Sequence, residues 1–135
     1  MDEHGLIYDW NTVDYEIDRT SVNHPHELWF DDETLRDGLQ SPSARNPEIE
    51  QKLELIDYME ALGIQKVDLG LPGAGPFHVG HIDAMLSHMG ENEYELRPGC
   101  AVRTVVSDIE PLVDLQAKHE RQIQASAFLG TSPIR

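Results

Sequence analysis

The sequence has little cysteine, little positive charge and no long hydrophobic run. Its one cysteine, Cys100, excludes an internal disulfide framework and suits a reducing compartment. Lys and Arg number 10 against 25 Asp and Glu, and the resulting net charge of -15 opposes nucleic-acid binding. No apolar run approaches the roughly 20 residues that cross a bilayer, and the acidic start does not resemble a signal peptide. We therefore expect a cytoplasmic protein that binds neither membrane nor nucleic acid.

The chain has the length of one domain, and 135 residues can bury a core. Its hydrophobic fraction of 39% and mean hydropathy of -0.45 are typical of a soluble globular protein. Residues 1–26 form a polar, acidic arm, which we expect to lie across a domain surface or to pair with another subunit. Residues 27–135 are expected to form the folded domain.

Hydrophobic patterning divides the domain into alternating strands and helices. Strand-like runs are expected at residues 28–30, 66–71, 100–106 and 123–129. Three helical patterns lie between these strands. The first starts at Asn46-Pro47 and ends at Gly63. The second has apolar residues from Ile82 to Met89 and stops at Gly90, and the third is capped by Ser107 or Asp108 and reaches about His119. The loop "PGAGP" after the second strand predicts a tight turn and lacks the spacing of a dinucleotide-binding loop.

This alternation predicts an α/β fold with parallel strands and covering helices. Four strands could form a small open sheet or half of a TIM (β/α)8 barrel, which takes roughly 250 residues when complete. The chain stops directly after its fourth strand. We therefore expect a half-barrel fragment that contains only the first four β/α units.

The segment "DETLRDGLQSPS", at residues 32–43, follows the first predicted strand. It closely resembles the first-strand signature of the metal-dependent aldolase-type TIM barrels (DRE-TIM metallolyases), which include the isopropylmalate and homocitrate synthases and hydroxymethylglutaryl-CoA lyase. The resemblance continues through "LGIQKVDLGLPGAGP", "AVRTVVSDI" and "FLGTSPIR", in the family's order and spacing. The Arg-Asp-Gly-x-Gln motif is the most specific part of this match.

The resemblance implies chemistry at the carboxyl ends of the barrel strands. Asp37 matches the family's metal-ligand aspartate, whose hard oxygen suits Mg or Mn and is compatible with Zn. Arg36 matches the catalytic arginine, whose charged fork stabilises a developing enolate or alkoxide oxygen. Taken without the resemblance, Arg36 and Asp37 would be an ordinary surface ion pair.

Four further residues are expected to bind substrate by the same resemblance: Gln40, Asp68, Arg103 and Thr131. Asp68 could also be a simple strand-end acid, and Arg103 could equally be a structural arginine. Thr131 stands in a Thr-Ser-Pro turn that needs no functional explanation.

Three positions depart from the family pattern. Asp68 stands where the family usually has Glu, Ser126 is aligned with a histidine of the isopropylmalate synthases, and Arg135 stands where a histidine often follows. These departures leave the particular keto acid open. His78 and His81 have metal-ligand spacing but no evident third ligand, so we expect solvated histidines.

The leading hypothesis is a segment of a 2-isopropylmalate synthase-like acyltransferase of amino-acid biosynthesis. It would use a divalent metal ion to join the acetyl group of acetyl-CoA to a 2-keto acid, as a homo-oligomer when full length, and the fragment alone would be inactive. A lyase that runs the related carbon–carbon cleavage is the enzymatic alternative. A non-catalytic binding or assembly module is the alternative if the chain truly ends at Arg135.

Overall fold

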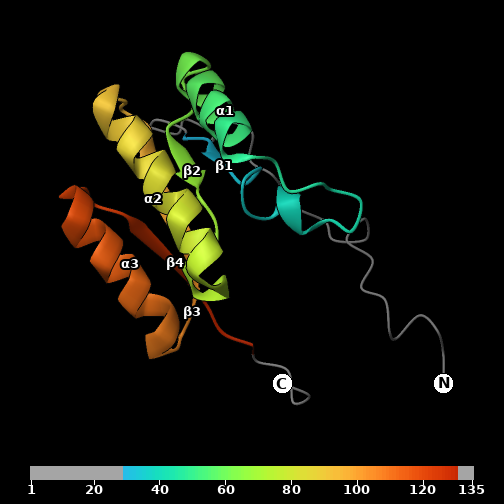
Figure 1. The fold of residues 1–135 in the computed structure, drawn as a ribbon, viewed down its shortest axis with the longest axis vertical. Helices are drawn as coiled ribbons and strands as arrows, with labels where there is room; N and C mark the ends of the chain where they lie inside the picture. The colour runs from blue at the N-terminus through green and yellow to red at the C-terminus, as the bar shows by residue number, and fades with distance from the viewer. Residues whose placement is uncertain (1–28, 131–135) are drawn as a thin grey trace, which may run out of the picture.

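The computed structural model describes residues 29–130, drawn in colour in Figure 1. The arm predicted at residues 1–26 and the predicted substrate-binding residue Thr131 lie outside this part. In chain order, the described elements are β1 (Asp31–Asp32), a 3-10 turn η3 (Gly38–Gln40), α1 (Ile49–Ala61), β2 (Lys66–Asp68), a 3-10 turn η4 (Pro72–Ala74), α2 (Pro76–Glu91), β3 (Arg97–Arg103), α3 (Val106–His119) and β4 (Gln124–Phe128).

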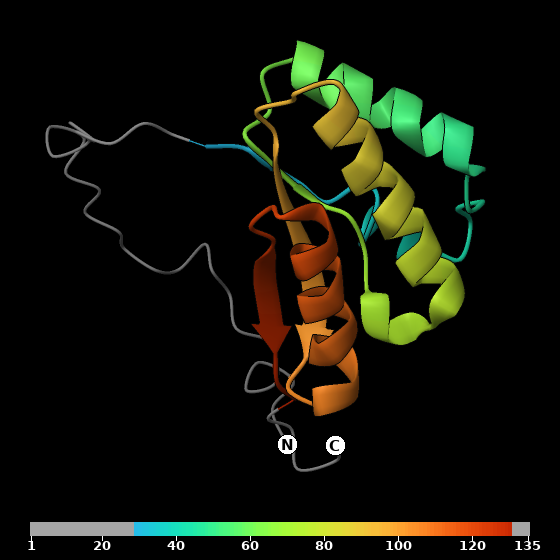
Figure 2. The same cartoon turned by 60° about the vertical axis from the view of Figure 1, so that its left-hand side comes forward.

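The four strands form one parallel sheet in the order β1-β2-β3-β4. Each helix leads from one strand to the next, and Figures 1 and 2 show all three helices on the same face of the sheet. The predicted α/β class, the parallel strands and their alternation with helices are therefore confirmed. None of the described helices is long and apolar enough to cross a membrane.

The core lies between the sheet and the helix layer. Burial of one large apolar side chain stabilises the fold by about 1.5–3 kcal/mol. Cys100 is among the fully buried residues, and its burial raises the pKa of the thiol. The buried hydrophobic cluster contains Leu35, Ile56, Met59, Val67, Leu69, Ile82, Met85, Leu86, Met89, Leu96, Cys100, Val102, Leu112, Leu115 and Ile123.

Polar contacts tie the helices to one another. The Asp83 carboxylate on α2 bonds to Lys118 Nζ at 2.7 Å and to His119 Nε2 at 2.7 Å, both at the end of α3. The Asp57 carboxylate on α1 bonds to His88 Nε2 on α2 at 2.5 Å. These contacts hold the helix layer together along one side of the sheet.

The first strand is not where the apolar run at residues 28–30 places it. The strand is Asp31–Asp32, while the Phe30 side chain is exposed. Trp29 is also exposed, and two cationic side chains lie over its ring. The Arg97 guanidinium is 4.1 Å and the Lys66 ammonium 5.7 Å from the ring centroid. Trp29 therefore packs through cation–π contacts and not as a core residue. The prediction of a buried strand is therefore wrong at residues 29 and 30, and residue 28 of the predicted strand lies outside the described residues.

Helix α1 begins two residues later than the Asn46-Pro47 pair predicts. Its cap is Glu48, whose side chain and that of Gln51 form a reciprocal capping box that satisfies backbone N–H groups of the first turn. Gly63, at a φ of 73°, follows the end of the helix as predicted.

Other boundaries also shift. Strand β2 ends at Asp68, three residues before its predicted limit, and α2 runs to Glu91, so Gly90 does not stop it. Strand β3 starts and ends three residues before its predicted limits, at Arg97 and Arg103. Helix α3 starts at Val106 with no side-chain cap, so neither Ser107 nor Asp108 caps it. Asp108 is instead buried within the first turn.

Candidate active site

The predicted site residues gather at one end of the sheet. Arg36 and Asp37 follow β1 by a few residues, Asp68 is the last residue of β2, and Arg103 is the last residue of β3. Parallel strands bring their carboxyl ends to the same edge, where α/β barrel enzymes place their sites. Arg36, Asp37 and Asp68 meet there, whereas Arg103 is bound to another partner.

Arg36 is the centre of a cluster of carboxylates. Its Nε donates a hydrogen bond to Glu33 Oε2 at 2.8 Å, and its terminal nitrogens lie 2.6 Å from Glu33 Oε2 and 3.2 Å from Asp37 Oδ1. Asp68 Oδ2 is 3.8 Å from Arg36 Nε. Turn bonds from the Arg36 and Gly38 N–H groups to the Glu33 carbonyl shape this loop. The guanidinium is thus fixed in place while its side chain stays 26% exposed.

Asp68 is a buried carboxylate, and one of its oxygens accepts no hydrogen bond from the described residues. Oδ1 accepts a hydrogen bond from the Gly70 N–H at 2.9 Å, but Oδ2 has no hydrogen-bond partner among the described residues. Burial raises the pKa of Asp68, and the nearby Glu33 adds to the rise, against opposing effects of the Gly70 N–H and Arg36. An incompletely satisfied, buried acid at a strand end is typical of functional sites.

Asp37 and Gln40 occupy the turn after Arg36. Asp37 is largely exposed, with its side chain 68% accessible, and Gln40 closes the short η3 turn through a backbone bond to the Asp37 carbonyl. Asp37 can offer one carboxylate oxygen to a divalent cation. Within residues 29–130, however, no three His, Cys, Asp or Glu side chains converge as a metal site. The described residues therefore do not by themselves fit a complete metal centre.

Arg103 forms a bidentate salt bridge with Asp108. Its Nε and NH2 groups donate to the Asp108 carboxylate oxygens at 2.8 and 2.6 Å, and its backbone N–H donates at 3.0 Å. The hydrogen bonds from Arg103 lower the pKa of Asp108, although burial opposes this effect. The structure thus gives Arg103 an intramolecular partner, and its role toward a substrate carboxylate stays a prediction.

The "PGAGP" loop is built around this ion pair. A Cβ atom added to Gly73 would lie 2.2 Å from the Asp108 carboxyl carbon, so only glycine lets the loop approach Asp108 this closely. Gly75, at a φ of 126°, turns the chain into α2 at Pro76. The predicted tight strand-to-helix turn is confirmed. Its contact with Asp108, and through Asp108 with Arg103, was not predicted from the sequence.

A pocket of about 250 Å³ lies beside Arg36 and Gln40, between the η3 segment and the first turns of α1 and α2. Lys52 and His81 line it and were not assigned to a site from the sequence. His78 is exposed, as expected. His81 is only partly exposed, and its buried Nδ1 has no hydrogen-bond partner among the described residues, so the expectation of a solvated histidine holds only in part for His81. No sequence motif marks Lys52, because a helix lysine is ordinarily solvated.

Parallel β/α units with an arginine–carboxylate cluster at the strand ends define a class of α/β proteins that place chemistry at that edge. Comparison with known families narrows this class. Residues 27–134 match the HMGL-like family model, and the chain belongs to this family, the DRE-TIM metallolyases.

The chain is also similar to curated synthases. It is 30% identical over 113 residues to a 2-isopropylmalate synthase of Synechococcus, a match that covers 84% of the chain and 20% of that protein. It is 28% identical over 110 residues to the 2-isopropylmalate synthase of Sediminispirochaeta smaragdinae, covering 82% of the chain. It is 36% identical over 93 residues to a homocitrate synthase of Methanopyrus kandleri, covering 67% of the chain. The chain spans about a fifth of the length of these relatives. No solved structure matches it significantly.

Proposed function

We propose that the chain is the first part of a TIM-barrel catalytic domain that condenses an acetyl group with a 2-keto acid. The observation that carries this proposal is the match of residues 27–134 to the HMGL-like family, together with the Arg36 cluster at the strand ends. The curated relatives above are named as synthases, which favours a synthase over a lyase. The four parallel strands in sequence order support the first half of such a barrel.

In the proposed reaction, the acetyl methyl of acetyl-CoA loses a proton and its carbon forms a bond to the keto carbon of the acid. The keto oxygen takes up a proton, and water then cleaves the thioester and releases the CoA thiol. A divalent metal bound to this enzyme would polarise the keto acid, and Asp37 would supply one of its ligands. No residue of the described part is assigned as the base that removes the methyl proton.

The roles of the other residues follow from their positions. Arg36 would stabilise the negative charge that develops on oxygen, because its guanidinium is held in place by Glu33 and Asp37 and remains partly exposed. Asp68, with an unpartnered carboxylate oxygen, would contact the substrate and contribute to its selection. Gln40 would lie near the same substrate, and Arg103 and Thr131 would bind its carboxylate end.

The test uses the gene product that contains this chain, expressed from its native reading frame with Mg, Mn or Zn. Thiol release from acetyl-CoA is measured with 2-ketoisovalerate, 2-ketoglutarate and pyruvate, and cleavage is measured separately with hydroxymethylglutaryl-CoA. Metal-dependent thiol release with one keto acid supports the synthase. Cleavage of hydroxymethylglutaryl-CoA without thiol release from acetyl-CoA contradicts it in favour of the lyase, and no reaction in either assay contradicts both.

Arg36→Lys is the sharpest variant for this proposal. It keeps the charge but loses the planar fork, so we expect turnover to fall by roughly a hundredfold or more while the Michaelis constant for the keto acid changes little. Arg45→Lys, which makes the same change in an exposed loop, serves as the matched control and should retain activity. Near-native turnover in Arg36→Lys would rule out Arg36 as the catalytic arginine.

A further inference from the structure

The pocket beside Arg36 and Gln40 has a lining whose formal charges are all positive. Besides Arg36, the ionisable side chains that line it are Lys52, His78 and His81, and no Asp or Glu among the described residues lines it. Its volume of about 250 Å³ is large enough for a small ligand. This charge pattern favours an anion over a metal ion.

Lys52 is the most unusual residue of this pocket. It is 5% exposed, on the face of α1 that also carries the buried Ile56 and Met59. Among residues 29–130, no hydrogen bond or ion pair involves its ammonium group, and burial lowers its pKa. A buried, unpaired charge is costly, and a nearby opposite charge offsets part of that cost. A negatively charged ligand in the pocket would therefore offset the cost of burying the Lys52 ammonium group.

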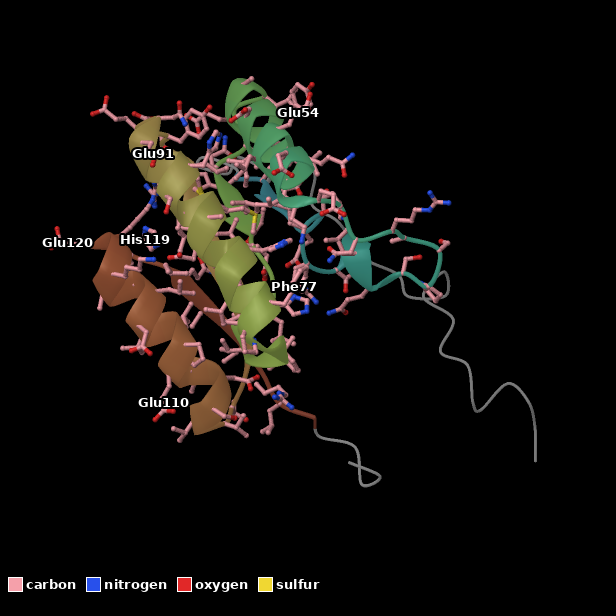
Figure 3. All side chains as sticks on the ribbon, viewed as in Figure 1. Glu54, Phe77, Glu91, Glu110, His119 and Glu120 are labelled. Atoms are coloured by element: carbon pink, nitrogen blue, oxygen red, sulfur yellow. The ribbon has the colours of Figure 1, made fainter. Side chains whose placement is uncertain are left out.

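His81 is the second residue of the pocket on which the argument rests. Its Nδ1 atom is buried and has no hydrogen-bond partner in the described part of the chain. The exposed Phe77 ring contacts the His81 ring, with the two centroids 4.2 Å apart. Figure 3 shows Phe77 at the start of α2, on the side toward the η3 segment. Burial and the neighbouring Lys52 lower the pKa of His81, while Glu48 and Glu50 act against them.

The remaining cation of the lining is already paired. Arg36 forms ion pairs with Glu33 and Asp37 and already has a role in the proposed reaction, so we do not assign the anion of this pocket to it. The overall charge of -15 repels anions at long range, but at physiological ionic strength charges beyond about 8 Å are screened. Lys52 lines the pocket and forms no ion pair with the described residues, so we assign the anion to it.

We propose that this pocket binds a small oxyanion, a carboxylate or a phosphate group, through Lys52 Nζ and His81 Nδ1. The imidazole donates when its proton is carried on Nδ1, and His78 stands exposed at the pocket lining, where it can complete the contact. The pocket shares Arg36 and Gln40 with the proposed active site, but the anion site itself is argued from Lys52 and His81 and goes beyond the proposed condensation. It is a binding site between η3, α1 and α2, adjacent to the Arg36 cluster.

The proposal is tested by titrating the 135-residue chain with inorganic phosphate and, separately, with acetate, at constant ionic strength in chloride. Binding is followed by calorimetry and by NMR shifts of the histidine ring protons. We expect one saturable site for at least one of the two anions, with shifts at His81. Tighter binding of phosphate identifies a phosphate group as the ligand class, and tighter binding of acetate identifies a carboxylate. The absence of saturable binding by both anions would overturn the proposal.

Lys52→Met keeps the length of the side chain and removes its charge. We expect it to weaken anion binding by at least about tenfold, the scale of one lost hydrogen bond to a charged group. Lys118→Met is the matched control, since it removes an equal charge from an exposed lysine paired with Asp83 and should leave the affinity within twofold. Equal weakening in the two variants would indicate non-specific attraction and overturn the site.

His81→Gln provides a second test that does not depend on Lys52. Circular dichroism first establishes that each variant is folded. We expect His81→Gln to weaken binding several-fold, because glutamine does not reproduce the fixed position of the ring nitrogen. Unchanged anion affinity in a folded His81→Gln variant would remove His81 from the site, and unchanged affinity in Lys52→Met as well would place any binding elsewhere.

Discussion

Asp68 combines burial with an unsatisfied oxygen, and this combination predicts a measurable stability effect. Its pKa is raised in the folded protein, first by burial and then by Glu33. The ionised side chain therefore costs stability at neutral pH, and this cost disappears as the pH falls through the raised pKa. We expect Asp68→Asn to increase the free energy of unfolding at pH 7 by more than about 0.5 kcal/mol, the range of ordinary surface substitutions.

Urea unfolding of the chain at pH 7 and at successively lower pH measures this effect. The difference between parent and Asp68→Asn should shrink on acidification, because the parent then carries a protonated Asp68. Asp114→Asn, an equal charge change at an exposed position of α3, should show little effect. A destabilised Asp68→Asn at pH 7 would mean that the carboxylate is held by stabilising contacts.

At the residue scale, sequence reasoning works where a motif fixes both residue type and spacing. The "LRDG" segment leads directly to Arg36 and Asp37, which the structure places together with Asp68. Lys52 could not be found in the same way, because its significance comes from burial and from the neighbouring His81. Both are properties of how α1 packs against α2, and neither is visible in the pattern of one helix.

At the scale of elements, Gly73 connects the loop after β2 to the start of α3. We expect Gly73→Ala to destabilise the chain by about 1–3 kcal/mol, because its Cβ would overlap the Asp108 carboxylate that Arg103 holds in place. Gly80→Ala is the matched control. Its Cβ would meet nothing within 4 Å on α2, so the better helix propensity of alanine should stabilise the chain.

Urea denaturation of both glycine variants provides the measurement. Combining Gly73→Ala with Asp108→Ala should show coupling, since the new methyl group costs less once the carboxylate is gone. Additive effects of the two substitutions, or a neutral Gly73→Ala, would show that the loop relaxes away from Asp108 at little cost.

Element order could be predicted from the sequence, while several boundaries could not. The apolar faces of α1 and α2 and the glycines that follow β2 identify the β/α units correctly. The prediction from the apolar run at Trp29 and Phe30 misplaces β1. Arg97 and Lys66 are distant in sequence, so the run alone does not show that they form cation–π contacts with the Trp29 ring. Asn46 misplaces the start of α1 because the capping box of Glu48 and Gln51 satisfies the helix N-terminus instead.

At the scale of the whole molecule, two opposing properties control association. Every residue of β4 is exposed, and α3 presents Val106, Ile109 and Val113 to solvent. β4 pairs with β3 on one side, and its other edge has no partner strand among residues 29–130. Exposed apolar surface next to such a strand edge favours contact with another chain. The net charge of -15 opposes it, because like-charged molecules repel one another.

We therefore expect the 135-residue chain to self-associate in a salt-dependent way. At about 1 M salt the Debye length falls to roughly 3 Å, so the repulsion is screened while the apolar attraction remains. Sedimentation velocity across protein concentrations, at low and high salt, should show association that strengthens with salt. Val113→Asp should weaken it roughly fivefold or more. Tyr58→Asp, an equal charge change at an exposed aromatic residue on α1, should weaken it much less, since it lies away from α3 and β4. A chain that stays monomeric at high salt, or that loses association equally in both variants, would show that the face formed by α3 and β4 does not mediate contact.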